Sequence, residues 1–167
     1  TAENKSRVYG AANPELTATY EGLVNEDTPA SLANPVVLAT TATVESSAGT
    51  YPITASGAAD ANYTITHVNG SLVVTPAPLT ITAENKNRTY GAANPALTAT
   101  YSGFVNGETA ANLDTPVALS TSATSLSPVG TYPITASAAV DVNYTINHVN
   151  GTLTVNPAPL TITAENK

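Results

Sequence analysis

An internal repeat of 81 residues constrains the fold of this chain more than any other feature. Sliding the 167-residue sequence against itself by 81 positions aligns it without a gap, and 56 of the first 81 positions are then identical. Self-similarity at a fixed period indicates repeated structural units. We therefore expect two small tandem domains, at residues 1–77 and 78–158, with residues 159–167 beginning a third, truncated repeat. The first copy lacks the Leu-Thr-Ile that precedes Thr82, so its first strand is expected to be incomplete.

The composition limits the chemistry that the chain can perform. It contains no cysteine, which excludes disulfides, thiolate metal sites and a cysteine nucleophile. Twelve acidic residues against five basic ones give a net charge of −7, and a negative surface repels phosphate groups. We therefore expect no nucleic-acid partner. No apolar run approaches the roughly 20 residues of a membrane-spanning helix, so no membrane span is expected in this segment.

An Asn-Gly pair lies between two alternating, β-rich runs in each copy, at Asn69-Gly70 and at Asn150-Gly151. This pattern is the strongest short-range signal for a β-hairpin with a type I′ turn. In such a hairpin, period-two alternation places five residues that are identical in both copies on one face, namely Tyr63, Ile65, His67, Leu72 and Val74. We expect this face to form the core, and the opposite face, which becomes more polar in the second copy, to face solvent.

The remaining β-branched and alternating runs predict the other strands. They lie at residues 16–20, 35–43, 50–56 and 79–83, and again at 97–101 and 131–137. Thr28 and Thr109 are suitable N-caps for one short helical turn in each copy. The Tyr-Gly-Ala-Ala-Asn-Pro segments at 9–14 and 90–95 predict loops, and the Pro-Ala-Pro junctions predict stiff, extended backbone between domains. The expected fold is therefore mainly β.

The basic residues all lie in or directly after the recurring segment Ala-Glu-Asn-Lys. One interpretation is that Glu84, Lys86 and Arg88 dock against the preceding domain. The interpretation that we favour is a strand end whose opposite charges compensate one another in solvent, which adds little stability. The two interpretations differ in whether Arg88 contacts its own repeat or its neighbour.

An aspartate precedes a tyrosine by three residues in both copies, at Asp60 and Tyr63 and at Asp141 and Tyr144. Oxygen ligands beside an aromatic ring suit Ca²⁺ or a sugar. A calcium loop of the EF-hand kind, however, needs more acidic positions and a closing glutamate. A side-chain turn formed by the aspartate explains the same residues, so we expect no metal site, and ligand contact stays an alternative.

His67 and His148 are the only histidines, one in each repeat. A single histidine on a core-facing strand is expected to be a partly buried, hydrogen-bonded residue. No nucleophile, base and orienting group stand out together as a catalytic set. We therefore expect no catalytic residues, no cofactor and no enzymatic activity.

Several motifs together resemble a known family. These are Tyr90-Gly91, the Gly-Thr-Tyr-Pro-Ile-Thr run from Gly130, and the Asn-Tyr-Thr-Ile and Asn-Gly-Thr-Leu-Thr-Val runs that follow. The chain is similar over nearly its whole length to the MBG domain of the YGX type, a tandem repeat of large bacterial surface and adhesin-like proteins. The resemblance implies β-grasp-like domains in an elongated arrangement, with immunoglobulin-like β-sandwich repeats as the alternative.

The resemblance also implies a role. We expect an extracellular, monomeric stalk on the bacterial cell surface, in which neighbouring repeats of the same chain contact each other and hold a distal binding region away from the cell. The rival hypothesis is that each repeat binds a host glycan or protein weakly and gains strength from multivalency. Saturable binding that is lost on changing Tyr63 or Tyr144 would favour the rival.

Overall fold

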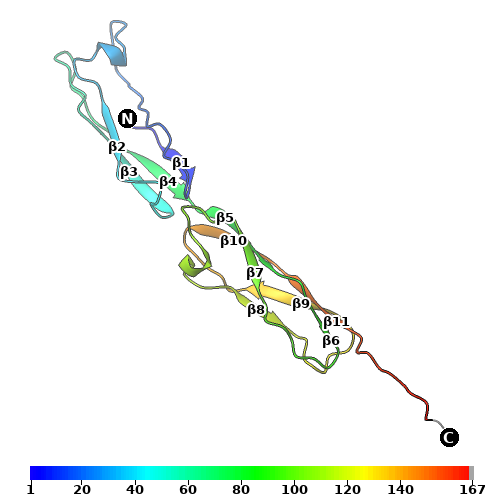
Figure 1. The fold of residues 1–167 in the computed structure, drawn as a ribbon. Coiled ribbons are helices and arrows are strands. Elements are labelled where there is room, and N and C mark those ends of the chain that lie inside the picture. Colours follow the sequence, from blue (N-terminus) through cyan, green and yellow to red (C-terminus); the bar gives the residue numbers. More distant parts are fainter. Residues whose placement is uncertain (166–167) are drawn as a thin grey trace. The chain divides into compact units, whose positions relative to one another are not determined.

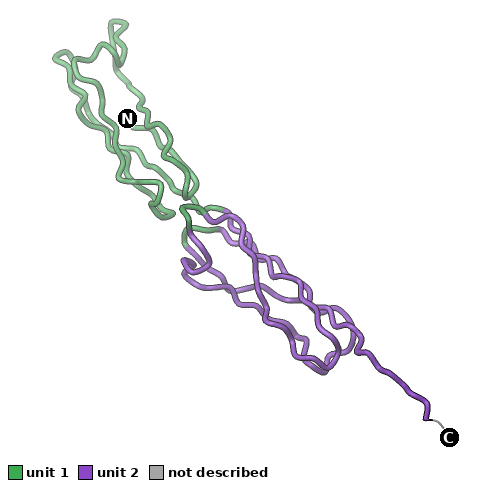
Figure 2. The backbone as a smooth tube through the Cα atoms, in the orientation of Figure 1, with its two compact units in different colours: residues 1–77, 105–107, 142–144 green, residues 78–104, 108–141, 145–167 purple. Residues whose placement is uncertain are grey.

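The structure is a computed structural model that describes residues 1–165 (Figure 1). The chain forms two compact units (Figure 2). Unit 1 comprises residues 1–77, 105–107 and 142–144, and unit 2 comprises residues 78–104, 108–141 and 145–167. Unit 1 thus contains the whole first repeat and two short segments of the second.

Unit 1 contains a four-stranded sheet in the order β1-β4-β3-β2. β1 pairs with β4 in parallel, whereas the β4–β3 and β3–β2 pairs are antiparallel. A single 3₁₀ turn, η1, precedes β2. The elements are β1 (Lys5–Val8), η1 (Pro29–Ser31), β2 (Val37–Thr40), β3 (Gly49–Ser56) and β4 (Gly70–Thr75).

The second repeat forms a sheet of the same topology, β6-β11-β9-β8, and a three-stranded sheet in the order β10-β5-β7. β5 is the strand that follows β4 after Pro76 alone. The elements are β5 (Ala77–Ala83), β6 (Lys86–Thr89), β7 (Ala99–Ser102), η2 (Ala110–Asn112), β8 (Ala118–Thr121), β9 (Gly130–Ser137), β10 (Tyr144–Val149) and β11 (Gly151–Asn156). The expected fold, mainly β in two tandem domains, is confirmed.

The short helical turns begin where the sequence predicts them. Thr28 is the N-cap of η1 with Pro29 as its first residue, and Thr109 is the N-cap of η2. Each forms a capping box with the third residue of its turn, Ser31 or Asn112. The box supplies acceptors for backbone N–H groups that have no partner inside a short turn.

The core of each sheet is small and built from equivalent positions. In unit 1 it comprises Ala2, Ala42, Ile53, Ala55 and Leu72, and in unit 2 it comprises Ala83, Ala123, Ile134, Ala136 and Leu153. The isoleucine and leucine of both clusters are completely buried. Alternate positions of β4 and β11 point to opposite faces, so Leu72 and Val74 are buried as predicted, whereas Val73 is exposed.

The predicted Asn-Gly hairpin is wrong. β10 and β11, which flank Asn150, belong to different sheets, because β10 lies next to β5 and β11 pairs with β9 and β6. Asn150 instead accepts a hydrogen bond through Oδ1 from the backbone N–H of Ala136, at 3.1 Å, and Asn69 accepts the matching bond from Ala55. The asparagine therefore holds the point at which the chain crosses between sheets.

The glycine of each pair is explained by a close backbone approach. A Cβ atom on Gly151 would lie 2.4 Å from the carbonyl oxygen of Ala83, and one on Gly70 would lie 2.6 Å from that of Ala2. Real Cβ atoms do not approach backbone this closely. The backbone at Ala83, the last residue of β5, therefore passes directly over Gly151, and the backbone at Ala2 passes directly over Gly70.

The first strand differs between the two repeats, as expected. In the second repeat, β5 pairs with β7 from Thr80↔Ser102 to Ala83↔Ala99. In the first, the corresponding pairing is the single bridge Ala2↔Ala18. Residues 157–165 carry no strand or helix, although residues 158–164 repeat the sequence of β5.

Replacing Gly151 by alanine should lower the stability of unit 2 by about 1–3 kcal/mol, because the added methyl group collides with backbone that cannot rotate away. Thermal unfolding followed by circular dichroism measures the change. Gly91→Ala is the control, since its φ is +84° but nothing lies within 4 Å of the new Cβ. That variant carries only backbone strain of about 1–2 kcal/mol. Equal stability of wild-type and Gly151→Ala proteins would contradict the close approach.

Candidate functional sites

A buried arginine lies at the centre of a polar network in each unit. Arg7 and Arg88 are both 6% exposed. Arg88 donates from Nε to Oδ1 of Asn94 at 2.8 Å, and from its terminal nitrogens to the carbonyl oxygens of Thr89 and Thr124. Asn94 then donates from Nδ2 to the Ala123 carbonyl at 2.6 Å. The guanidinium thus joins its own strand, the following loop and a distant turn.

The same network exists in unit 1 with the same donors and acceptors. Arg7 donates from Nε to Asn13 at 2.7 Å and reaches the carbonyls of Val8 and Thr43, and Asn13 donates to Ala42 at 2.6 Å. The expectation of a solvated charge cluster is therefore wrong for the arginines. Their cost of burial is offset because the guanidinium donates to several fixed oxygens.

The neighbouring Glu-Lys pairs are as predicted, with opposite charges that compensate one another. Lys86 Nζ lies 3.0 Å from Glu84 Oε2, and Lys5 lies 2.9 Å from Glu3. Thr98 also donates its hydroxyl to Glu84. This hydroxyl bond, and then the ammonium of Lys86, lower the pKa of the Glu84 carboxyl below its ordinary value of 4.5. These half-exposed pairs add little stability.

The contacts described for Glu84, Lys86 and Arg88 are made with residues 84–124 of their own unit. Through these contacts the carboxylate, the ammonium and the guanidinium each have at least one partner within unit 2. Docking of these side chains against the preceding domain stays a prediction.

Asp60 forms the side-chain turn that the sequence suggested. Its Oδ1 accepts from the backbone N–H of Asn62 at 2.9 Å, and its Oδ2 accepts from that of Ala33 at 3.1 Å. Oδ1 therefore holds the backbone that leads to Tyr63, and Oδ2 joins this turn to the segment that follows η1. Asp141 likewise has a partner in the structure.

The two predicted ligand-contact tyrosines have different surroundings. The Tyr63 hydroxyl donates to Asp27 Oδ2 at 2.6 Å, and this bond to a carboxylate raises the pKa of the phenol. Tyr144 is 5% exposed, and its hydroxyl accepts from the backbone N–H of Val105 at 3.2 Å. Tyr144 is therefore too buried to contact a ligand, and only Tyr63 is accessible.

The Tyr-Gly pair of the first loop packs within unit 1. The rings of Tyr9 and Tyr144 meet edge to face, with their centroids 5.7 Å apart, a favourable geometry for aromatic pairs. Gly10 has φ +79°, and a Cβ there would lie 2.5 Å from Val105 Cγ2. The motif therefore combines a buried ring with a residue that must lack a side chain. The recurrence of Tyr-Gly in both repeats marks the position in the sequence, but the sequence does not predict that Tyr9 packs against Tyr144.

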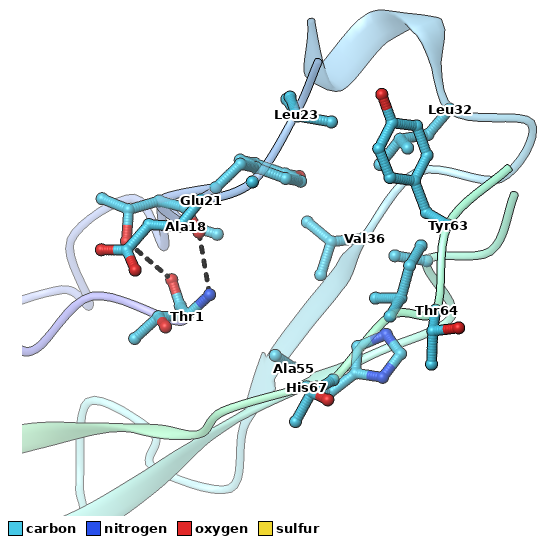
Figure 3. Close-up of a pocket in the computed structure, with 16 residues that line it drawn as sticks. Thr1, Ala18, Glu21, Leu23, Leu32, Val36, Ala55, Tyr63, Thr64 and His67 are labelled. Atoms are coloured by element: carbon cyan, nitrogen blue, oxygen red, sulfur yellow. Dashed lines mark hydrogen bonds between the residues drawn. The ribbon is translucent and has the colours of Figure 1, made fainter. Parts of the chain in front are cut away.

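Unit 1 contains a groove of about 430 Å³ between segments 18–23 and 63–67 (Figure 3). Tyr63 and His67 lie along one side of the groove, and Ala18 and Glu21 lie along the other. Val36 projects into the space between them (Figure 3). Tyr63, a predicted ligand-contact residue, is among the residues that line the groove.

The histidines do not form a recognisable centre. His67 is exposed at the groove, contrary to the expected core-facing position, whereas His148 is half-buried. Within residues 1–165, Nε2 of His148 has no hydrogen-bond partner. The same residues contain no group of three or more histidine and acidic side chains that could hold a metal ion. They also contain no helix long and apolar enough to span a membrane.

The two β units, each with its own equivalent arginine network, define a tandem-repeat protein built mainly from strands. The chain belongs to the MBG domain (YGX type) family, which matches residues 1–73 and 79–154. Repeats of this family are associated with cell-surface proteins. A search of curated proteins gave no significant match.

Replacing Arg88 by leucine should destabilise unit 2 by about 2–3 kcal/mol, because it leaves partly buried carbonyl and amide oxygens without their charged donor. Urea denaturation followed by tyrosine fluorescence measures the loss. Lys86→Leu is the matched control and should change stability by less than about 1 kcal/mol, since it removes only a half-exposed ion pair. If both variants unfold at the same urea concentration, the arginine network is not a structural centre.

Proposed function

We propose that these repeats are structural spacers in the stalk of a bacterial cell-surface adhesin, where they hold a distal binding region away from the cell. The observation that carries this proposal is the direct passage from one repeat to the next. One residue, Pro76, separates β4 from β5, and its ring restricts the backbone at the junction. A spacer needs such a short link, because a flexible linker would not keep successive repeats at a fixed separation.

The use of the polar residues supports the same proposal. Arginine, asparagine, aspartate and tyrosine side chains that resembled candidate sites are engaged in hydrogen bonds inside their units. Their equivalents in both repeats make similar bonds. These side chains thus serve to hold the fold, as a stalk requires.

The rival proposal, a multivalent binding module, needs the same accessible site in every repeat. Only the first repeat meets this condition at the tyrosine, because Tyr63 lines the groove while Tyr144 is buried. A multivalent array based on this tyrosine is therefore the weaker alternative. If a glycan or protein binds one repeat alone, the array gains no strength from multivalency.

Small-angle scattering of a length series tests the spacer. Residues Ala77 to Thr89, which include β5 and β6, span about 40 Å at about 3.3 Å per residue. Inserting one or two further copies of residues 78–158 should therefore lengthen the particle by a constant increment of this order. A maximum dimension that does not grow with copy number would contradict the proposal.

A glycan and host-protein screen on the same series separates the rival. The spacer predicts no saturable binding at any length. Binding whose strength rises steeply with copy number, and which Tyr63→Phe and Tyr144→Phe remove together, would favour the multivalent module instead.

A further inference from the structure

The chain contains three Asn-Gly dipeptides, and the structure places one of them differently from the other two. Asn106 and Gly107 form a two-residue turn, and both are exposed. The glycines of the other two dipeptides, at residues 69–70 and 150–151, begin the strands β4 and β11. The same dipeptide is therefore held at the start of a strand twice and lies in an open turn once.

An asparagine before a glycine can lose its side-chain amide without an enzyme. The glycine backbone nitrogen gives up its proton and attacks Cγ of the asparagine, the bond from Cγ to the amide nitrogen breaks, and ammonia leaves with the proton. The product is a five-membered succinimide ring. Water then opens the ring, either at Cγ to give aspartate or at the main-chain carbonyl carbon to give isoaspartate. Glycine favours the attack because no side chain shields its nitrogen.

Both reacting groups of the turn at 106–107 are accessible. Within residues 1–165, neither the Asn106 side chain nor the Gly107 N–H has a hydrogen-bond partner. Nothing lies within 4 Å of the position that a Cβ would take on Gly107. Water therefore reaches the glycine nitrogen, and the asparagine side chain is free to rotate toward it.

The other two dipeptides are held at the groups that would react. Oδ1 of Asn150 accepts from the backbone N–H of Ala136, and Oδ1 of Asn69 accepts from that of Ala55, both at 3.1 Å. A backbone carbonyl oxygen also lies 2.4 Å from the Cβ position of Gly151. Attack on Cγ there requires the side chain to leave its bond and the strand to open locally.

We propose that Asn106-Gly107 is a site of spontaneous deamidation, at which Asn106 becomes aspartate or isoaspartate while the fold protects the other two Asn-Gly dipeptides. The first repeat has Asn25-Glu26 at the equivalent position. Asn25 and Asn106 have the same φ of +54°, and Glu26 has φ +63° where Gly107 has +73°. The backbone is thus similar, but the glutamate side chain shields the nitrogen. The modification is therefore specific to the second repeat, and the inference does not rest on the stalk proposal.

The modified residue adjoins a contact inside unit 1, to which residues 105–107 belong. Val105 donates its N–H to the Tyr144 hydroxyl at 3.2 Å, and its Cγ2 lies 2.5 Å from the Cβ position of Gly10. Isoaspartate inserts one further carbon into the backbone beside Val105, so this contact cannot keep its geometry. Aspartate leaves the backbone unchanged and tolerates a left-handed φ as asparagine does. Isoaspartate should therefore lower the unfolding temperature of unit 1, whereas Asn106→Asp should not.

Incubation of the protein in heavy-oxygen water at mildly alkaline pH, followed by peptide mapping with mass spectrometry, measures all three sites in one sample. The heavy oxygen marks only those acids that form during the incubation. Asn106 should convert first, and Asn69 and Asn150 at least about tenfold more slowly, because reaction there waits for local opening. In urea, which unfolds the chain, the three sites should convert at similar rates.

Gly107→Glu is the matched variant, because it recreates the Asn-Glu dipeptide that the first repeat already accommodates in a turn of similar conformation. It should slow the conversion of Asn106 to the rate of Asn25. Three results would overturn the proposal: conversion of Asn106 in this variant at the wild-type rate, equal rates at the three sites of the folded protein, or a preference for Asn106 that persists in urea.

Thermal unfolding followed by circular dichroism tests the effect on unit 1. The isoaspartate form is separated from the incubated protein by ion exchange and compared with Asn106→Asp, which carries the same added charge on an unaltered backbone. Equal unfolding temperatures would contradict the displacement of Val105. Growth in particle size in the scattering series depends on none of these results, so this proposal and the spacer fail separately.

Discussion

The second repeat depends on burial of the strand that links it to its predecessor. Along β5 the alternate side chains Ala77, Leu79, Ile81 and Ala83 are at most 2% exposed. These residues supply much of the apolar burial available to a domain whose core otherwise consists largely of alanine and single aliphatic residues. The strand that connects the repeats is therefore part of the second domain.

Polar interactions complement this small core. In unit 1 the Arg7 guanidinium, fixed by three acceptors, positions the Tyr-Gly loop without adding apolar volume, and Asn13 of that loop donates to a further carbonyl. The loop then presents Tyr9 to Tyr144 within unit 1. The Tyr-Gly signature of the first repeat is thus a structural element, whose ring and glycine both pack within unit 1.

The pattern of the sequence predicted most strands, both N-caps and the alternation of core positions, because these depend on local geometry. It failed at Asn150-Gly151, where the same dipeptide serves a crossing between sheets and the glycine is required by contact with Ala83. It also placed Arg88 in solvent, since arginine is seldom buried. Both features depend on contacts between residues that are far apart in the chain, and a single sequence does not show which of these residues meet.

The chain contains its own control for the claim that the linking strand is structural. Residues 77–83 and 158–164 have identical sequences, but the first are buried in a sheet and the second carry no assigned structure. Amide hydrogen exchange at low protein concentration compares them directly. The account predicts that the amides of β5 are protected as strongly as those of β9 and β11, while residues 158–164 exchange at the rate of an unstructured peptide. Equally fast exchange of both segments would contradict it.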